Sequence, residues 1–319
     1  MSQESPLHDQ TPDFVPDHVL ERAYAECRAI ARREAKNFYY SFVALPKPRR
    51  DAICAIYAFM RKADDLSDDE SISRGERRAC LDAWITEWHA ASAGAPTADL
   101  VFIAVRDAIR RFNIPLSLLD ELVAGTTMDL EHAAETVDTY ATFNDLYRYC
   151  YLVASVVGLV CIRIFGYTDA RAEKFAEETG IAFQLTNILR DVAEDAERKR
   201  VYLPLDDLAA HNVSLDSLLN RARGAAPTAN ERALLFSIGQ RAEDYYRSAR
   251  TLLPLIDRES RPALWVLVKI YHRLLKNIRR ADYDVFSRRI RVPSFQKLEI
   301  LAAGLGWMAW VRLRPSGSR

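Results

Sequence analysis

The chain of 319 residues carries 44 basic and 44 acidic side chains, and 49% of its residues are hydrophobic. This length and composition predict a large buried core in one or two domains. The zero net charge provides no global field for nucleic acid, so any charge recognition must come from local clusters. The five cysteines follow no CxxC spacing, which is typical of reduced thiols rather than of a disulfide framework.

Helical periodicity runs through nearly the whole chain, and prolines fall near the expected helix ends. Residues 1–16 have neither a basic start nor an apolar stretch, so a flexible tail is expected there rather than a signal peptide. Without a linker or a repeat, the pattern predicts one large all-α domain over 17–312 and a tail at 313–319. Segment 196–227 is the least regular. Helices are expected at about 17–34, 48–68, 74–92, 98–112, 115–133, 142–165, 169–195, 228–254, 259–281 and 294–311.

A first acidic column lies in YAFMRKADDLSDDE, residues 57–70. If Tyr57 is set at zero on a helical wheel, Arg61 falls at roughly 40°, Asp64 at roughly 340° and Asp68 at roughly 20°. An aromatic ring, a cation and two carboxylates therefore share one narrow face. Stacked carboxylates repel each other by a few tenths of a kcal/mol, and a divalent cation would turn that repulsion into binding.

A second acidic column lies in FQLTNILRDVAEDAERKRVYLP, residues 183–204. Counted from Gln184, Asn187 falls at roughly 300°, Asp191 at roughly 340° and Asp195 at roughly 20°. The rest of this helix is largely apolar, so the polar stripe is expected to line a cavity. Amide oxygens and carboxylates can both ligate a metal ion, and amide groups can also donate to a phosphate.

Cations accompany both columns, at Arg61, Arg190 and Arg200. Mg²⁺ is usually held by one or two carboxylates, with waters and substrate phosphates completing its shell. Arginines beside such carboxylates would bind phosphate oxygens. The ligand that these residues indicate is a diphosphate, although each column alone is also compatible with a solvated helix face.

The two columns resemble the motifs of the squalene/phytoene synthases, which join prenyl chains head to head. The resemblance runs from about residue 33 to 298 and includes YCYLVASVVG, where Ser155 replaces a common glycine, and YDVFSRRIRVP at 283–293. It implies packed helices around a deep central cavity, the class I isoprenoid synthase type of fold.

The resemblance also implies roles for particular residues. Metal ligands would be Asp64, Asp68, Asp191 and Asp195, with Asn187 beside them. Diphosphate contacts would come from Arg61, Arg190, Arg200, Gln184, Tyr271 and Arg288. The catalytic set would be Arg61 with three tyrosines near the reacting carbons, Tyr57, Tyr149 and Tyr202. The prenyl channel would be lined by Phe38, Phe42, Cys54, Val153, Ala154, Val157, Gly158, Gly180 and Phe183.

The expected reaction is a Mg²⁺-dependent condensation of two identical prenyl diphosphates through a cyclopropylcarbinyl diphosphate, with Mn²⁺ as an alternative ion. Phe42 hints at a short channel and Cys54 at a long one; the slight preference is for two C15 farnesyl diphosphates over two C20 geranylgeranyl diphosphates. NADPH use stays open, because no Gly-rich dinucleotide loop occurs. A cytoplasmic enzyme is expected, which would hand its product to later isoprenoid enzymes. The segment LAAGLGWMAWVRLR is expected to form a last core helix, and loose attachment to a membrane through it is the alternative.

Other helical classes fit less well. Head-to-tail elongation enzymes would carry a second Asp-Asp-x-x-Asp, and cyclases would place Ser or Thr and Glu after Asn187. A di-iron bundle would need Glu-x-x-His, and no histidine follows a glutamate by three residues. A non-catalytic scaffold of the same fold is the alternative of another class, and it would have no need to keep all four aspartates.

Overall fold

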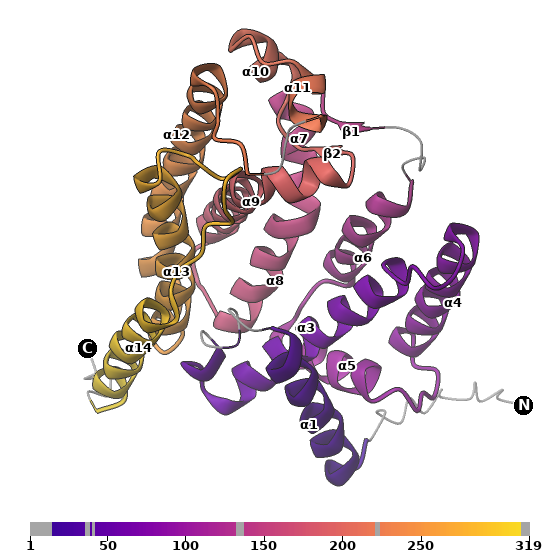
Figure 1. The fold of residues 1–319 in the computed structure, drawn as a ribbon. Helices are drawn as coiled ribbons and strands as arrows, with labels where there is room; N and C mark the ends of the chain where they lie inside the picture. The colour runs from indigo at the N-terminus through magenta and orange to yellow at the C-terminus, as the bar shows by residue number, and fades with distance from the viewer. Residues whose placement is uncertain (1–14, 36–38, 40–41, 132–136, 221–223, 314–319) are drawn as a thin grey trace, which may run out of the picture.

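The expected helices are present at nearly the same positions in the computed structural model, which describes residues 15–35, 39, 42–131, 137–220 and 224–313. The described residues form helices joined by loops and turns, with two very short strands (Figure 1). The helices are α1 (Asp17–Glu34), α3 (Lys47–Ser67), α4 (Arg74–Ser92), α5 (Leu100–Phe112), α6 (Leu116–Glu131), α7 (Phe143–Cys150), α8 (Val156–Phe165), α9 (Arg171–Glu197), α10 (Leu205–Ala210), α11 (Leu215–Leu219), α12 (Ala229–Leu252), α13 (Arg261–Arg280) and α14 (Ser294–Leu313).

Local sequence signals set several of the helix ends. Capping boxes start α4, α7 and α12, with Ser73, Thr142 and Thr228 accepting from the backbone three residues on. Pro48 occupies the first turn of α3, where its missing N–H is of no consequence. Helix α5 ends at Asn113, which adopts the left-handed conformation with φ of 48°.

The single helix expected over 142–165 is interrupted, which corrects the sequence-based expectation. A π-helical turn, Tyr151–Ser155, separates α7 from α8. At this turn α9 comes so close that a Cβ added to Gly180 would lie 2.5 Å from the Ser155 Cα. The Ser155 hydroxyl, which is fully buried, donates to the Glu177 carbonyl at 2.7 Å. A 3.6-residue period does not reveal one extra residue in a turn, so the interruption was missed.

Segment 196–227, the least regular part of the sequence, contains elements that are too short to give a periodic pattern of hydrophobic residues. Helices α10 and α11 lie in it, as does β2 (Arg200–Val201), which pairs in parallel with β1 (Asp138–Thr139). These two-residue strands were not expected from the sequence. They tie the end of α9 to the segment before α7.

Helix α9 occupies the middle of the fold (Figure 1), in contact with α12, α13, α8 and the π-turn. On one side, α1, α3 and α5 pack against each other. Helix α4 joins them through an aromatic cluster in which its Trp84 and Trp88 contact Phe59 of α3 and Phe102 of α5. The stretch Phe143–Phe165 is apolar and long enough to cross a membrane by composition alone. In the fold it packs against α9.

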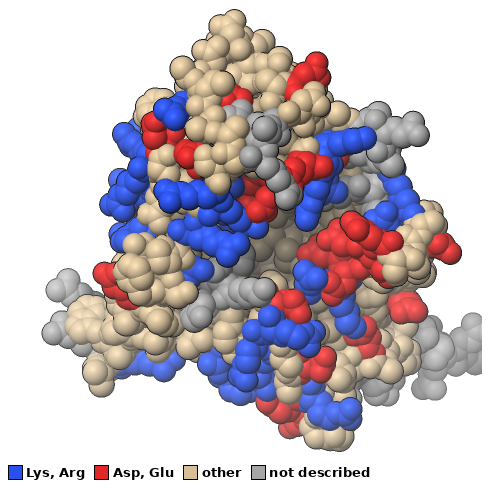
Figure 2. All heavy atoms as spheres, viewed as in Figure 1, with Lys and Arg blue, Asp and Glu red and all other residues tan. Residues whose placement is uncertain are grey.

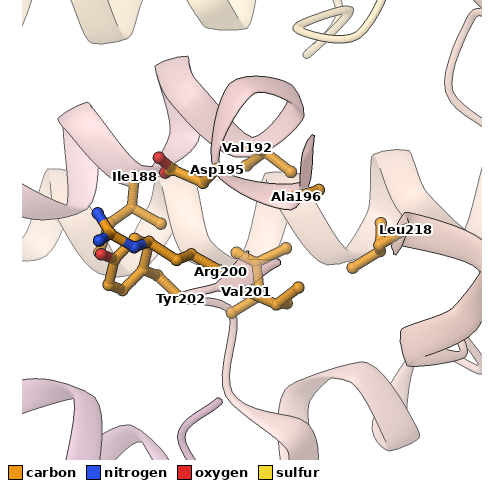
Figure 3. Close-up of a pocket in the computed structure, with 9 residues that line it drawn as sticks. Ile188, Val192, Asp195, Ala196, Arg200, Val201, Tyr202 and Leu218 are labelled. Atoms are coloured by element: carbon orange, nitrogen blue, oxygen red, sulfur yellow. The ribbon is translucent and has the colours of Figure 1, made fainter. Parts of the chain in front are cut away.

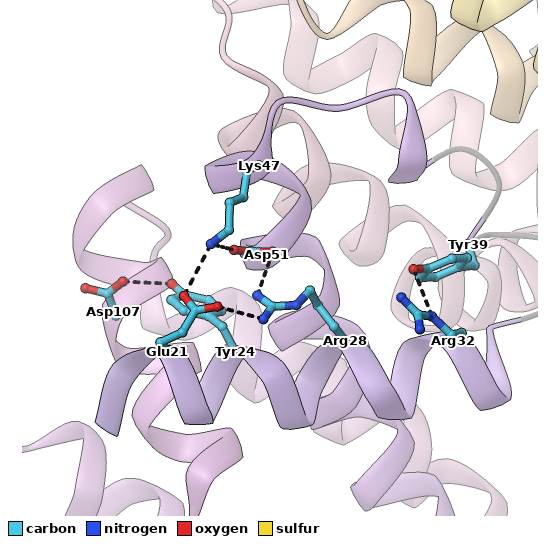
Figure 4. Close-up of polar contacts among 8 residues, drawn as sticks. All are labelled: Glu21, Tyr24, Arg28, Arg32, Tyr39, Lys47, Asp51 and Asp107. Atoms are coloured by element: carbon cyan, nitrogen blue, oxygen red, sulfur yellow. Dashed lines mark hydrogen bonds and ion pairs between the residues drawn. The ribbon is translucent and has the colours of Figure 1, made fainter. Parts of the chain in front are cut away.

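A charged network joins α1 to α3 (Figure 4). Buried Asp51 forms ion pairs with Arg28 at 3.1 Å and with Lys47 at 2.9 Å, and exposed Glu21 contacts the same two cations. Alongside it, the Tyr24 hydroxyl donates to buried Asp107 at 2.7 Å. Buried charges of this kind are tolerated because each has a partner of opposite sign.

Replacing Asp51 with alanine should lower the free energy of unfolding by about 2–4 kcal/mol, because Arg28 would lose its buried counter-ion. Glu21→Ala, which removes an exposed carboxylate from the same network, should change stability far less. Denaturant unfolding of both variants measures the difference. Equal losses from the two variants would contradict the central place given to Asp51.

Candidate active site

An apolar cavity of about 260 Å³ runs between α3, α8, α9 and α13. Each helix supplies a stripe of side chains at helical spacing, so the cavity follows directly from the periodicity of the sequence. The described lining residues on these four helices and the π-turn are Ile53, Ile56, Tyr57, Met60, Val153, Ala154, Val157, Gly158, Cys161, Ile162, Phe165, Ala176, Thr179, Gly180, Phe183, Gln184, Asn187, Leu264, Leu267 and Tyr271; Phe42 and Leu252 complete the wall.

The stripe on α9 changes from apolar to polar along its length. It begins at Ala176 and reaches Gln184 and Asn187, whose side chains hydrogen-bond at 3.3 Å. Because Gly180 faces Ser155 and Ala176 lies against Gly158, α9 runs antiparallel to α8. The polar end of the cavity is therefore the end where α7 passes into the π-turn.

The first acidic column reaches the same end. A pocket lined by Asp64, Asp68 and Thr126 shares Met60 and Val153 with the apolar cavity. The Thr126 hydroxyl on α6 donates to Asp64 Oδ1 at 3.2 Å. Asp68 lies one residue beyond the end of α3 and is exposed, so the column ends as a helix cap rather than as a continuous helical face.

Burial and neighbouring negative charges raise the pKa of one carboxyl group in each acidic column. Burial, together with the charge of nearby Asp68, raises the pKa of Asp64 to about 6 despite the Thr126 hydrogen bond. Burial and the charge of Asp191 raise the pKa of Asp195 to about 7. Both carboxylates are thus placed where a bound cation would stabilise their ionised forms.

Arginines surround the second column. Asp191 lies between Arg190, which pairs with it directly, and Arg289, whose guanidinium is 2.8 Å away. Arg289 also reaches Glu194 at 2.7 Å. The diphosphate contact expected from Arg288 has no counterpart among these ion pairs, and it is the next residue, Arg289, that the fold brings to the acidic residues.

A basic cavity adjoins this cluster and shares Tyr271 with the apolar one. Its charged lining comprises Arg190, Arg289, Arg291 and Lys297. Sequence reasoning missed the last three as site residues. The signal for Arg289 and Arg291 was the run RRIR before α14, which stands out by charge but not by helical spacing, and Lys297 gave no signal of its own. Figure 2 shows the hollowed face with acidic and basic residues gathered around it.

Two of the expected arginines have other partners. Arg61 forms an ion pair with Asp65 on the neighbouring face of α3 rather than with Asp64 or Asp68. Arg200 lies 3.8 Å from Asp138 and lines a small pocket with Asp195 (Figure 3). Both guanidiniums lie beside the acidic columns, but the polypeptide itself already supplies each with a carboxylate.

The expected aromatic residues fall into separate groups. Tyr149 and Tyr202 stack with ring centroids 4.9 Å apart, and Tyr140 completes their cluster. Tyr57 instead lines the apolar cavity from α3. Phe183 stacks on Tyr271 at 4.4 Å where the two cavities meet.

Most of the expected channel residues line the apolar cavity, namely Phe42, Val153, Ala154, Val157, Gly158, Gly180 and Phe183. Cys54, which was also expected in the channel, does not line this cavity. It is fully buried against α1 near Cys27, whereas its neighbours Ile53 and Ile56 face the cavity. One residue on a helix rotates the side chain by about 100°, which explains the error. Phe38 lies outside the described residues.

The polar end fits a divalent cation with oxygen ligands. Within the described residues, no three His, Cys, Asp or Glu side chains lie close enough to hold a metal ion by themselves. In the same part of the chain, the Asn187 Oδ1 is buried without a hydrogen-bond partner. Carboxylates with raised pKa values and an unpaired amide oxygen suit an ion whose other ligands are water and phosphate.

The squalene/phytoene synthase family model matches residues 31–296. A 15-cis-phytoene synthase of Synechococcus elongatus is 36% identical over 291 residues, covering 88% of this chain and 91% of that protein. A phytoene synthase of Mycobacterium tuberculosis is 34% identical over 290 residues, covering 90% and 91%. These alignments extend over the helices that line both cavities.

Solved structures agree. A dehydrosqualene synthase in complex with a ligand superposes with a TM-score of 0.80 at 28% identity, covering 93% of this chain and 100% of that one. The squalene synthase HpnC from Alicyclobacillus acidocaldarius gives 0.75 at 28% identity, covering 85% and 97%. The fold and the matches define a prenyltransferase that joins prenyl chains head to head. The chain belongs to the squalene/phytoene synthase family, as its motifs indicated.

Substituting Gly180 with alanine should destabilise the fold by about 1–3 kcal/mol and impair turnover, because the new methyl group would overlap the Ser155 backbone. Gly306→Ala is the matched control: it adds the same group on a helix where nothing lies within 4 Å. That change should be neutral or stabilising by up to about 1 kcal/mol. Thermal and denaturant unfolding compare the two, and an unchanged Gly180→Ala would refute the close contact.

Proposed function

We propose that the protein condenses two geranylgeranyl diphosphates head to head to form phytoene, with Mg²⁺ at the polar end of the cavity. The observation that carries this proposal is a long apolar cavity ending among carboxylates and arginines. Relatives named phytoene synthases align over about nine-tenths of the chain. They favour C20 substrates over the C15 preference drawn from the sequence.

Neither sequence cue decides the length of the channel. Phe42, the cue for a short channel, lines the cavity, whereas Cys54, the cue for a long channel, faces the core. The preference for C20 substrates therefore depends on the relatives. The end of the cavity away from the acidic residues is lined by Phe165, Leu252 and Leu264. Those side chains, rather than Cys54, would set how long a prenyl tail fits.

Two groups of residues at the polar end would bind the diphosphate of the substrate. Asp64, Asp68, Asp191, Asp195 and Asn187 would hold Mg²⁺, which, when bound, neutralises the leaving diphosphate. Arg190, Arg289, Arg291 and Lys297 would bind phosphate oxygens from the basic cavity. Tyr271 lines both cavities and Gln184 lines the polar end of the apolar one, and both would orient the first carbon of the chain.

The apolar walls would protect the reaction once the allylic C–O bond breaks. The lining excludes water, which would otherwise capture the carbocation. Aromatic faces such as Phe183 and Tyr57 would stabilise positive charge by about 0.5–2 kcal/mol each. The double bond of the second chain attacks C1 of the first, and loss of a proton closes a cyclopropane. Ionisation of that diphosphate, rearrangement and a final proton loss give phytoene without a reductant.

Asp64→Asn and Asp191→Asn should each reduce diphosphate release from geranylgeranyl diphosphate and Mg²⁺ by at least about a thousandfold, because each removes charge opposite the leaving group. Asp82→Asn, the same change on exposed α4, serves as the control and should retain activity. Phosphate release coupled to pyrophosphatase measures all three. Turnover retained in both site variants would refute the assignment.

Cys161→Phe should shorten the cavity, because Cys161 lines it toward the end away from the acidic residues. We expect the variant to lose most C20 turnover while its ratio of C15 to C20 turnover rises by about tenfold or more. Chromatography of products formed without NADPH from each substrate measures the ratio. A parallel loss of both activities would place the chain terminus elsewhere.

A further inference from the structure

Three separate elements meet at the end of the apolar cavity that lies away from the acidic residues, called here the far end. The side chains there are Ile53 of α3, Phe165 of α8, and Leu252 and Leu264, which flank the connection between α12 and α13. On α3, Ile53 precedes Asp64 by roughly three helical turns, or about 16 Å. The placement of these three elements relative to one another therefore sets the length of the cavity.

The Arg49 guanidinium joins α3 to the connection between α12 and α13. Its Nη2 donates to Asp257 Oδ2 at 2.7 Å, and its Nη1 donates to the Ser260 hydroxyl at 2.6 Å. Ser260 lies immediately before α13 and is fully buried. Because the donors of a guanidinium have fixed directions in one plane, both partners are held in a defined position relative to α3.

Gly166, at the end of α8, is the third element held by these contacts. Its carbonyl accepts from the Asp257 backbone N–H at 2.8 Å. A Cβ added to Gly166 would overlap the Asp257 carboxylate and lie 3.2 Å from Arg49 Nη2, so both charged groups pack directly on this glycine. Its φ of 79° also favours glycine. The preceding residue in the chain is Phe165 of the cavity wall.

Each of these contacts lies within one helical turn of a side chain that lines the far end. Arg49 precedes Ile53 by four residues on α3, so the two lie on the same face of that helix. Ser260 likewise precedes Leu264 by four residues, and its carbonyl accepts from the Leu264 N–H at 3.2 Å. The contacts therefore act on the wall of the cavity rather than on a distant part of the surface.

The connection between α12 and α13 has a separate support of its own. Arg261 donates from Nε to the Ile256 carbonyl at 2.8 Å and from Nη2 to the Pro254 carbonyl at 2.7 Å. These bonds stay within the connection, whereas those of Arg49 reach it from another helix. Loss of the Arg49 guanidinium should therefore let the connection shift as a unit without unfolding it.

We propose that Arg49, Asp257 and Ser260 form a clamp that positions the far end of the cavity and thereby limits the length of the prenyl chain that the enzyme accepts. The three are positioning residues, since none of them is among the described residues that line the cavity. The statement about prenyl chains rests on the proposed function. Without the clamp, the segment that carries Leu252 and Leu264 would be free to move away from Phe165, which would leave room for further carbons.

The test compares turnover of C25 geranylfarnesyl diphosphate with turnover of C20 geranylgeranyl diphosphate. Arg49→Met keeps an apolar stem but removes the guanidinium, and it should raise the C25 to C20 ratio of kcat/KM by about tenfold or more. Arg49→Lys keeps a cation for Asp257 and should raise the ratio by less than about threefold. A gain with the longer substrate is not expected from a general loss of stability.

The matched control is Arg241→Met. Arg241 contacts Asp207 through two nitrogens, at 2.6 and 3.1 Å, and joins α12 to α10. In Figure 1, α10 lies near the short strands, away from the connection between α12 and α13. This variant therefore loses a two-pronged arginine contact between elements but should keep the wild-type ratio.

Hydrogen exchange followed by mass spectrometry provides a readout that does not depend on turnover. Residues 163–167 and 253–260 should exchange faster in Arg49→Met than in the wild type or in Arg241→Met. If Arg49→Met does not fold, Asp257→Asn, which keeps the shape of the side chain and removes its charge, replaces it with the same expected changes.

An unchanged ratio in the folded clamp variant, or unchanged exchange in both segments, would overturn the proposal. So would an equal rise of the ratio in Arg241→Met, because the effect would then not belong to the far end. Absence of wild-type turnover with every prenyl diphosphate would instead refute the proposed function. The exchange rates would in that case decide whether the clamp holds the far end.

Discussion

The structure depends on gathering acidic residues at one end of an apolar cavity. Asp64 and Asp195 are buried beside other carboxylates, and their pKa values rise to about 6 and about 7. An arrangement of this kind costs free energy in the polypeptide alone. A bound multivalent cation would offset this cost, and the neighbouring arginines would bind the oxygens of an anionic ligand held by that cation, which supports the proposed metal–diphosphate site.

Helix α9 carries most of this constraint. One face of it begins at Ala176 as cavity wall, becomes polar at Gln184 and Asn187, and ends in the second acidic column. To hold that face in place, α9 packs so closely on the π-turn that position 180 has no room for a side chain. The π-turn and Gly180 therefore act together to align the apolar wall of the cavity with its polar end.

The helices and the single all-α domain could be predicted from the 3.6-residue period that the chain displays. Most of the cavity wall was predicted from the resemblance of the motifs to the family. Both kinds of prediction failed at particular residues. Cys54 was placed in the channel although its neighbours Ile53 and Ile56 face it, an error of one position on the wheel. Arg289 and Arg291 lie in the non-helical segment before α14 and Lys297 in the first turns of α14, so only the fold reveals that all three line one cavity with Tyr271.

Arg289 shows why such residues escape a reading of helices alone. Its guanidinium bridges Asp191 and Glu194 across the gap between α9 and the segment before α14. In the free protein this contact offsets the repulsion within the second column. Binding of a cation there would satisfy Asp191 by itself and leave the guanidinium to a phosphate oxygen. The basic cavity and the second acidic column would thus act together: charges that pair with each other in the fold would become the phosphate-binding and cation-binding halves of the proposed site.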